Sequence, residues 1–154
     1  MNTAEKPNVL IFIMDDQAPG HISYLDGTPI STPHLDELAK RSSYFRPYTT
    51  VPVCTPARAE FLTGRNSFQN GCRWFGEPIK DTITLLPQVI SDAGYHTCHI
   101  GKWHNNGHPR DFGYDETHFV FPQDLSGPRN GHDFVFDGDG MKIPRHSTEL
   151  LGEA

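Results

Sequence analysis

Residues 50–65 read TVPVCTPARAEFLTGR and predict a helix whose start is framed by two prolines. Thr55 is suited to cap this helix, Pro56 to occupy its first position and Gly64 to end it. Cys54 would then lie just outside the N-terminus, where unpaired amide groups and the helix dipole favour negative charge. The stretch therefore predicts an exposed and reactive side chain at Cys54.

The alternative for any free cysteine is the role of a small buried hydrophobic residue. That interpretation fits Cys72 and Cys98 better than it fits Cys54, because their neighbours carry no comparable framing. At Cys54 the flanking prolines and Arg58, one helical turn further on, favour a functional role instead. Three cysteines without a CxxC pair also argue against a disulfide framework, although one bridge stays open.

Closer to the N-terminus, the run NVLIFIM at residues 8–14 is continuously apolar and ends at Asp15 and Asp16. Such a run is typical of a strand that is buried on both faces of a parallel sheet. Sites in open α/β sheets form at the carboxyl ends of strands, and paired carboxylates suit a hard divalent cation. The alternative is that the two aspartates merely end the strand in water.

Downstream of the central helix, TLLPQVISDAG at 84–94 predicts another helix, and YHTCHI at 95–100 predicts a strand. GKWH follows, so Lys102 and His104 stand at a second carboxyl strand end, where they supply a cation and a titratable donor. The competing interpretation has both side chains in solvent, with Trp103 as a packing anchor.

These elements come in the order strand, helix, helix and strand, which indicates an α/β sandwich. An additional helix is predicted at 31–42, with Thr32 as its cap and Pro33 in its first position. The segment 66–82 contains several glycine and proline residues and is expected to be irregular.

The C-terminal part of the chain, residues 116–154, is rich in glycine, proline and aspartate and predicts loops with one or two short strands. Within it, DGDG at 137–140 predicts a turn, and HSTELLGEA at 146–154 predicts the start of a helix. Because a helix starts where the chain stops, we expect residues 1–154 to be the N-terminal, truncated part of a longer domain.

The 154 residues carry a formal net charge of −6, which disfavours a nucleic-acid or anionic membrane surface. The apolar run near the N-terminus is too short for a secretory signal, and no stretch is long enough to span a membrane. The missing signal favours a cytoplasmic location, but the compartment stays open.

Four motifs in the same order resemble type I sulfatases of the alkaline phosphatase superfamily: PNVLIFIMDDQ, CTPARAEFLTGR, AGYHTCHIGKWH and PRDFGYD. They lie within residues 7–115, and the second matches the signature Cys-x-Pro-Ser/Ala-Arg followed by Thr-Gly. The resemblance implies a partial alkaline-phosphatase-like sandwich, with a mostly parallel sheet flanked by helices.

The resemblance also implies a sulfuric ester hydrolase. Cys54 would be oxidised to Cα-formylglycine by a separate maturation enzyme and would act as an aldehyde hydrate. One hydroxyl would attack sulfur and displace the alcohol, and the second would then expel sulfate and restore the aldehyde. The substrate would be a sulfate ester, either a small molecule or a saccharide.

Each site residue has an implied role in this scheme. Asp15, Asp16 and the modified cysteine would bind a divalent cation, Ca²⁺ in the first place and Mg²⁺ in the second. Arg58 would orient the formylglycine, whereas Lys102 and His104 would bind sulfate and the hydrate.

Three alternatives stay open. Family members run to several hundred residues, and their remaining metal ligands, second sulfate-binding lysine and second histidine would lie beyond residue 154. The chain would then be a non-catalytic fragment or a degraded paralogue. Relatives in the superfamily also cleave phosphate or phosphonate esters. A cysteine hydrolase that pairs Cys54 with His104 is the remotest interpretation.

Overall fold

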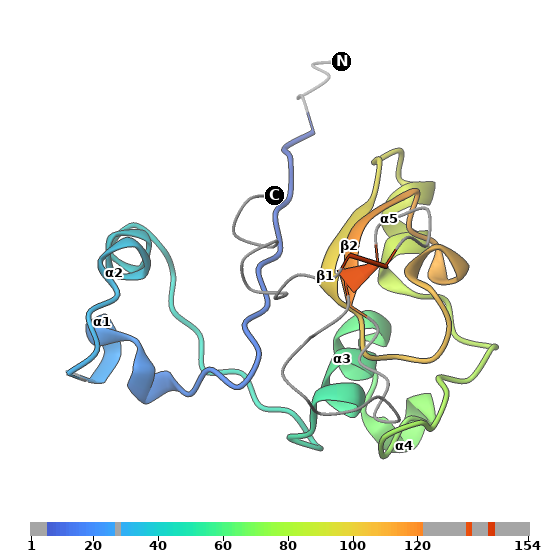
Figure 1. Ribbon diagram of the computed structural model, residues 1–154, viewed down its shortest axis with the longest axis horizontal. Coiled ribbons are helices and arrows are strands. Elements are labelled where there is room, and N and C mark those ends of the chain that lie inside the picture. The colour runs from blue at the N-terminus through green and yellow to red at the C-terminus, as the bar shows by residue number, and fades with distance from the viewer. Residues whose placement is uncertain (1–5, 27–28, 122–134, 137–141, 144–154) are drawn as a thin grey trace. The chain divides into compact units, whose positions relative to one another are not determined.

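The computed structural model describes residues 6–26, 29–121, 135–136 and 142–143. They fall into two compact units, one up to Pro47 and one from Tyr48 onward (Figure 1). The elements in chain order are η1 (Pro19–His21), α1 (Ser23–Asp26), α2 (Pro33–Lys40), α3 (Cys54–Thr63), α4 (Ser67–Asn70), α5 (Leu86–Asp92), β1 (Cys98–Lys102), η2 (Pro109–Phe112), β2 (Glu116–Phe121), β3 (Val135–Phe136) and β4 (Lys142–Ile143).

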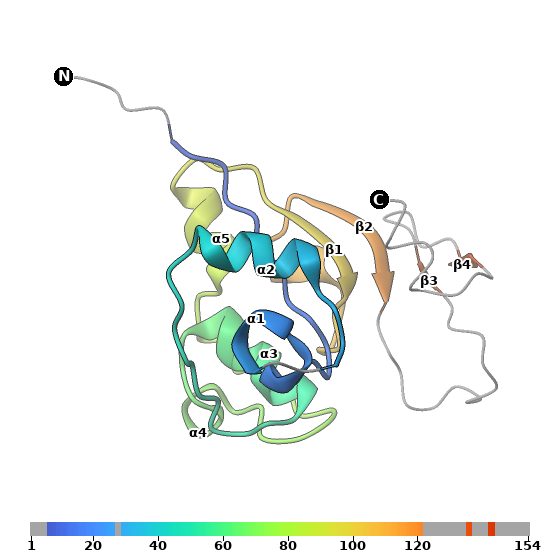
Figure 2. The same ribbon diagram turned by 90° about the vertical axis from the view of Figure 1, so that its left-hand side faces the viewer.

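In the first unit the short helices α1 and α2 lie next to each other (Figure 2), and polar side chains join them. Thr32 and Pro33 start α2 as predicted, but the Thr32 hydroxyl donates to Asp36 Oδ1 at 2.8 Å instead of accepting from the helix. Ser23 Oγ donates to Asp36 Oδ2 at 2.6 Å, and this bond lowers the pKa of Asp36 most. No described residue of this unit is buried.

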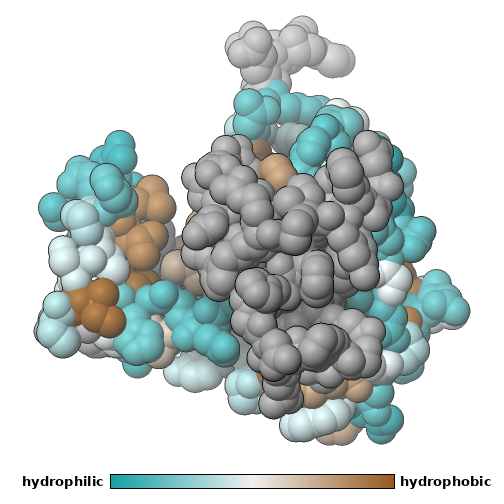
Figure 3. All heavy atoms as spheres, in the orientation of Figure 1, coloured by the Kyte–Doolittle hydropathy of each residue, from teal (hydrophilic) through white to brown (hydrophobic). Residues whose placement is uncertain are grey.

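The prediction of a strand at residues 8–14 is wrong among the residues of the first unit that the structure describes. The segment has no strand pairing there, and Leu10 and Phe12 are 89% and 80% exposed. Hydrophobic side chains accordingly lie at the surface of this unit (Figure 3). The apolar run suits a doubly buried strand, but a strand forms only where other strands accept its backbone hydrogen bonds.

The second unit contains a compact hydrophobic core drawn from α3, the segment between α4 and α5, the residue that follows β1, and β2. Its buried members are Ala59, Leu62, Cys72, Ile79, Ile83, Leu85, Trp103 and Val120. β1 pairs with β2 in parallel, and two short antiparallel pairs extend the sheet in the order β1-β2-β3-β4. The predicted α/β class, with a parallel pair flanked by helices, is confirmed.

Helix α3 begins at Cys54, with Val53 as the N-cap, and not at Pro56 as predicted. The first bond is already made by Ala57 N, which donates to Val53 O at 2.9 Å. Pro56 therefore occupies the third helical position. A proline is tolerated there because the first-turn amides have no partner inside the helix. Gly64 ends the helix as predicted, with a left-handed φ of 62°.

Other boundaries shift modestly from the prediction. α5 lies inside 84–94, and β1 begins at Cys98, three residues after the expected start. α4 is a single turn within 66–82, where we expected irregular chain, and Asn66 caps it by accepting from Gln69 N at 3.0 Å. The turn at 137–140 and the helix at 146–154 lie outside the described residues. None of the described helices is long and apolar enough to cross a lipid bilayer.

Glu60 ties α3 to two neighbouring segments of the second unit. Its carboxylate accepts from Thr49 Oγ1 at 2.6 Å, from the Thr50 amide and hydroxyl, and from Ser67 N and Oγ at 3.0 and 2.8 Å. Burial on its own raises the pKa of Glu60, but these hydrogen bonds outweigh it and lower the pKa to about 2. The carboxylate thereby links the chain before α3 to the start of α4.

We expect Glu60→Gln to lower the free energy of unfolding by about 1–2 kcal/mol at pH 7. This loss is smaller than for a fully buried carboxylate, because the Glu60 side chain is only half-buried and solvent screens its interactions. The Glu60 carboxyl binds a proton less tightly in the folded state than in the unfolded chain. The stabilisation by the Glu60 carboxylate is therefore complete above pH 4.5 and is lost as the pH falls toward 2. Urea unfolding across this range measures it. The exposed Glu37→Gln serves as the matched control, and equal losses in the two variants would contradict the prediction.

Candidate active site

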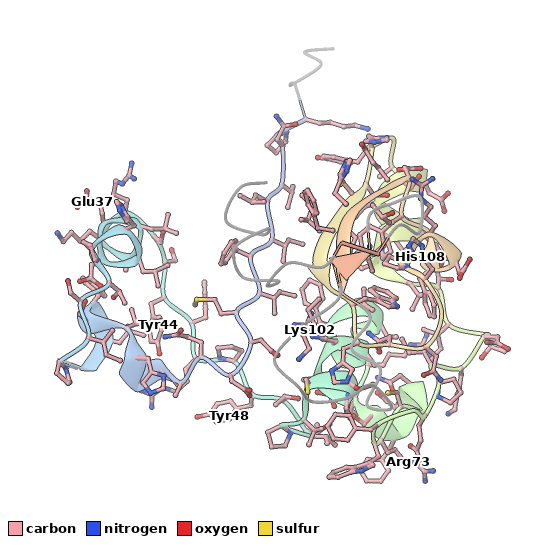
Figure 4. The ribbon with its side chains drawn as sticks, in the orientation of Figure 1. Glu37, Tyr44, Tyr48, Arg73, Lys102 and His108 are labelled. Atoms are coloured by element: carbon pink, nitrogen blue, oxygen red, sulfur yellow. The ribbon has the colours of Figure 1, made fainter. Side chains whose placement is uncertain are left out.

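A hydrogen bond joins the two motifs that carry the predicted chemistry. Arg58 Nη1 on α3 donates to the carbonyl oxygen of Lys102 at the end of β1, at 2.7 Å. Figure 4 shows Lys102 beside α3. Cys54 lies one turn before Arg58, so the two side chains share a face of α3 with their Cβ atoms about 5–6 Å apart. The structure thus brings α3 and the GKWH segment to one place in the second unit.

The pairing of β1 with β2 is irregular beside Lys102. Two steps along β1, from Ile100 to Lys102, match three steps along β2, from His118 to Phe121. The extra residue falls near Phe119, which has a positive φ of 46°. β-Bulges of this kind change the direction in which following side chains point and often occur beside active sites.

His104 is held in a strained backbone conformation. Its φ is 54°, a left-handed value that non-glycine residues seldom adopt, and the side chain is 7% exposed. Its ring lies 5.5 Å from that of Phe75, centroid to centroid. Trp103, one residue earlier, is 2% exposed and packs against Phe112. The structure therefore confirms Trp103 as a packing anchor, but it contradicts the interpretation that His104 is solvated, because this side chain is buried.

Positive potential gathers around this part of the second unit. The N-terminus of α3 carries unpaired amides and the positive end of the helix dipole, and Cys54 is its first residue. Arg58 and Lys102 add two cationic side chains from adjacent elements. Together they can attract an anionic group such as a sulfate and stabilise charge that develops on it.

Another histidine of the second unit, His99, lies on β1. Burial lowers its pKa to about 4, despite a backbone hydrogen bond at Gly101 that raises it. Its Nε2 is buried without a hydrogen-bond partner among the described residues, and its ring packs edge-on against Trp103 at 5.2 Å. At neutral pH this imidazole is uncharged and serves as packing.

Asp15 and Asp16 belong to the first unit, whereas the other predicted site residues belong to the second. Both aspartates are exposed, and Asp16 has a positive φ of 56°. Exposed carboxylate oxygens fit a hard cation such as Ca²⁺ or Mg²⁺ as part of its ligand set. That Asp15, Asp16 and Cys54 share one cation stays a prediction.

Sequence reasoning did not find Phe75, the ring beside His104. Phe75 comes from an irregular loop, and the two residues approach only through the packing of the second unit. A hydrophobic residue in a glycine-rich loop carries no periodicity that would have identified this contact.

Comparison with known proteins identifies the family in which these motifs occur. The profile of the sulfatase family matches residues 7–145. The uncharacterized sulfatase YidJ of Escherichia coli (strain K12) is 40% identical over 105 residues, which cover 68% of this chain and 21% of that protein. N-sulphoglucosamine sulphohydrolase of Homo sapiens is 38% identical over 122 residues, which cover 73% of this chain and 24% of that protein.

A solved structure gives the same assignment at the level of the fold. It shows a protein in complex with its substrate D-glucosamine-2-N,6-O-disulfate and aligns with a TM-score of 0.78 at 26% identity. The alignment covers 97% of this chain and 30% of that one, so the predicted partial fold is confirmed. The chain spans between about a fifth and a third of the lengths of these relatives.

Proposed function

The chain belongs to the sulfatase family, and from that membership we propose that it supplies the nucleophile and the positively charged, sulfate-binding side chains of a sulfuric ester hydrolase. The observation that carries the proposal is the 2.7 Å hydrogen bond from Arg58 to the Lys102 carbonyl. It joins the cysteine-bearing helix to the lysine- and histidine-bearing loop, as a common site requires.

The proposed nucleophile is the hydrate of a formylglycine made from Cys54. One of its hydroxyls attacks sulfur and the alcohol leaves, and loss of the proton from the second hydroxyl then expels sulfate and restores the aldehyde. Arg58, one turn along α3, orients this group. Lys102 binds a sulfate oxygen and balances its charge, and His104 holds a proton for the departing alcohol.

A divalent cation bound by Asp15, Asp16 and the modified Cys54 would lower the pKa of the attacking hydroxyl and neutralise sulfate charge. The two carboxylates supply the hard oxygen donors that this role needs. Calcium fits this donor chemistry, and magnesium is the second choice.

The proposed substrate class is a sulfated saccharide. One relative aligned above is a protein in complex with D-glucosamine-2-N,6-O-disulfate, and another is named a sulphohydrolase of N-sulphoglucosamine. Both of these compounds are sulfated amino sugars. We extend that class to this chain as part of the proposal.

Mass spectrometry of the protein from its own cells tests the proposal. Trypsin should release residues 42–58 as one peptide, because Arg46 precedes Pro47. We expect this peptide to carry the aldehyde at Cys54 and the intact protein to hydrolyse an aryl sulfate faster than the matched phosphate diester. An unmodified thiol without turnover would overturn the proposal and support a non-catalytic chain. Faster phosphate cleavage would support a phosphoester hydrolase.

A further inference from the structure

A second cluster of ligand-type side chains lies on the sheet, away from the residues assigned to sulfate chemistry. Cys98 on β1 pairs in register with Glu116 on β2, and Ile100 pairs with His118. Because side chains alternate along a strand, Glu116 and His118 project from the same face of β2. Together with Cys98 they form a group at the surface. Cys98 is exposed, so the role of a small buried residue is wrong for this cysteine, whereas Cys72 is buried.

The donor atoms of this group are already close to one another. One ligand atom each from Cys98, Glu116 and His118 lies within 4.8 Å of the other two. His118 Nε2 is 2.6 Å from Glu116 Oε1, and His96 Nε2 is 3.0 Å from Glu116 Oε2. Zinc bond lengths of about 2.0–2.3 Å in a tetrahedron put ligand atoms about 3.3–3.8 Å apart. The separations among Cys98, Glu116 and His118 are therefore near those of a zinc coordination shell, and His96 lies next to this group through Glu116.

His96 is the candidate for the fourth ligand, and a neighbouring carboxylate lies near its other ring nitrogen. Asp115 Oδ2 lies 3.9 Å from His96 Nδ1, on the opposite side of the ring from Glu116. The Thr97 amide and hydroxyl both donate to this oxygen at 2.8 Å, which fixes its position. The 3.9 Å separation is an ion-pair distance and not a hydrogen bond, so Asp115 would have to move closer to orient the His96 ring as carboxylates commonly do for ligating histidines.

We propose that His96, Cys98, Glu116 and His118 bind a Zn²⁺ ion that links β1 to β2. One thiolate, two imidazoles and one carboxylate are the ligands that zinc takes in tetrahedral sites, whereas calcium and magnesium take oxygen ligands. The proposal does not depend on the sulfatase activity, because it uses none of the residues assigned to that reaction.

Cobalt titration of the full chain tests the proposal, because Co²⁺ enters zinc sites and a thiolate ligand gives it a near-ultraviolet charge-transfer band. We expect this band, its displacement by Zn²⁺, and no displacement by Ca²⁺. Cys98→Ser should abolish the band, and His118→Gln should weaken zinc binding by more than about 100-fold.

Two matched variants serve as controls. Cys54→Ala removes the half-buried side chain at the start of α3, which is a thiol wherever it has not been converted to formylglycine, and His34→Gln removes an exposed histidine of α2. Both should leave the cobalt band and the zinc affinity unchanged. The proposal is overturned if the thiolate band is missing, if it persists in Cys98→Ser, or if it disappears in Cys54→Ala. Circular dichroism of each variant verifies that the fold is retained.

Discussion

Replacing Cys54 by alanine is expected to lower kcat/KM for a sulfate ester by about 10⁴-fold or more, the scale on which removal of a nucleophile acts. Cys54 is the first residue of α3 and provides the only proposed nucleophile of the reaction. Binding through Arg58 and Lys102 would survive the change, so kcat should fall far more than KM rises. Initial rates on an aryl sulfate measure both constants.

The control for this prediction is Phe61→Ala, which shortens an exposed side chain of the same helix. It should retain turnover close to that of the unmodified sequence. A thiol-alkylating reagent adds a second readout, since an aldehyde does not react as a thiol does. Retained activity in Cys54→Ala would refute the assigned nucleophile, and complete inactivation by alkylation would point instead to a cysteine hydrolase.

Trp103→Ala is expected to lower the free energy of unfolding by about 3–5 kcal/mol, the usual cost of removing a large buried aromatic side chain. Trp103 is 2% exposed, and its ring contacts those of His99, Phe112 and Tyr114 at centroid distances of 5.2, 5.0 and 6.1 Å. Since it lies between Lys102 and His104, its loss should also reduce turnover. Urea unfolding followed by circular dichroism measures the stability.

Trp74→Ala is the matched control, because this tryptophan is 57% exposed and belongs to the same unit. Its removal should lower the free energy of unfolding by less than about 1 kcal/mol, as is usual for surface positions. The loss of stability in Trp103→Phe should lie between those of Trp74→Ala and Trp103→Ala, because the smaller ring keeps part of the packing. Similar losses for Trp74→Ala and Trp103→Ala would contradict the view that Trp103 anchors the GKWH segment.

The sequence alone predicted those features that depend on a few neighbouring residues. Gly64 ends α3 and Pro33 starts α2, because a left-handed glycine and a fixed proline φ act within one turn of chain. The first turn of α3 was placed two residues too late, because proline tolerates more than one position there. The motif around Cys54 was likewise local, and it correctly indicated the family.

The tertiary structure decided what depends on distant partners. The apolar run at 8–14 looks like a strand, yet the described first unit pairs it with none. The bond between Arg58 and Lys102 spans 44 positions, and the pairing of Cys98 with Glu116 requires the parallel register of β1 and β2. Local dihedral preferences act within a turn of chain, whereas hydrogen-bond ladders and ligand clusters exist only once folding has joined separate segments.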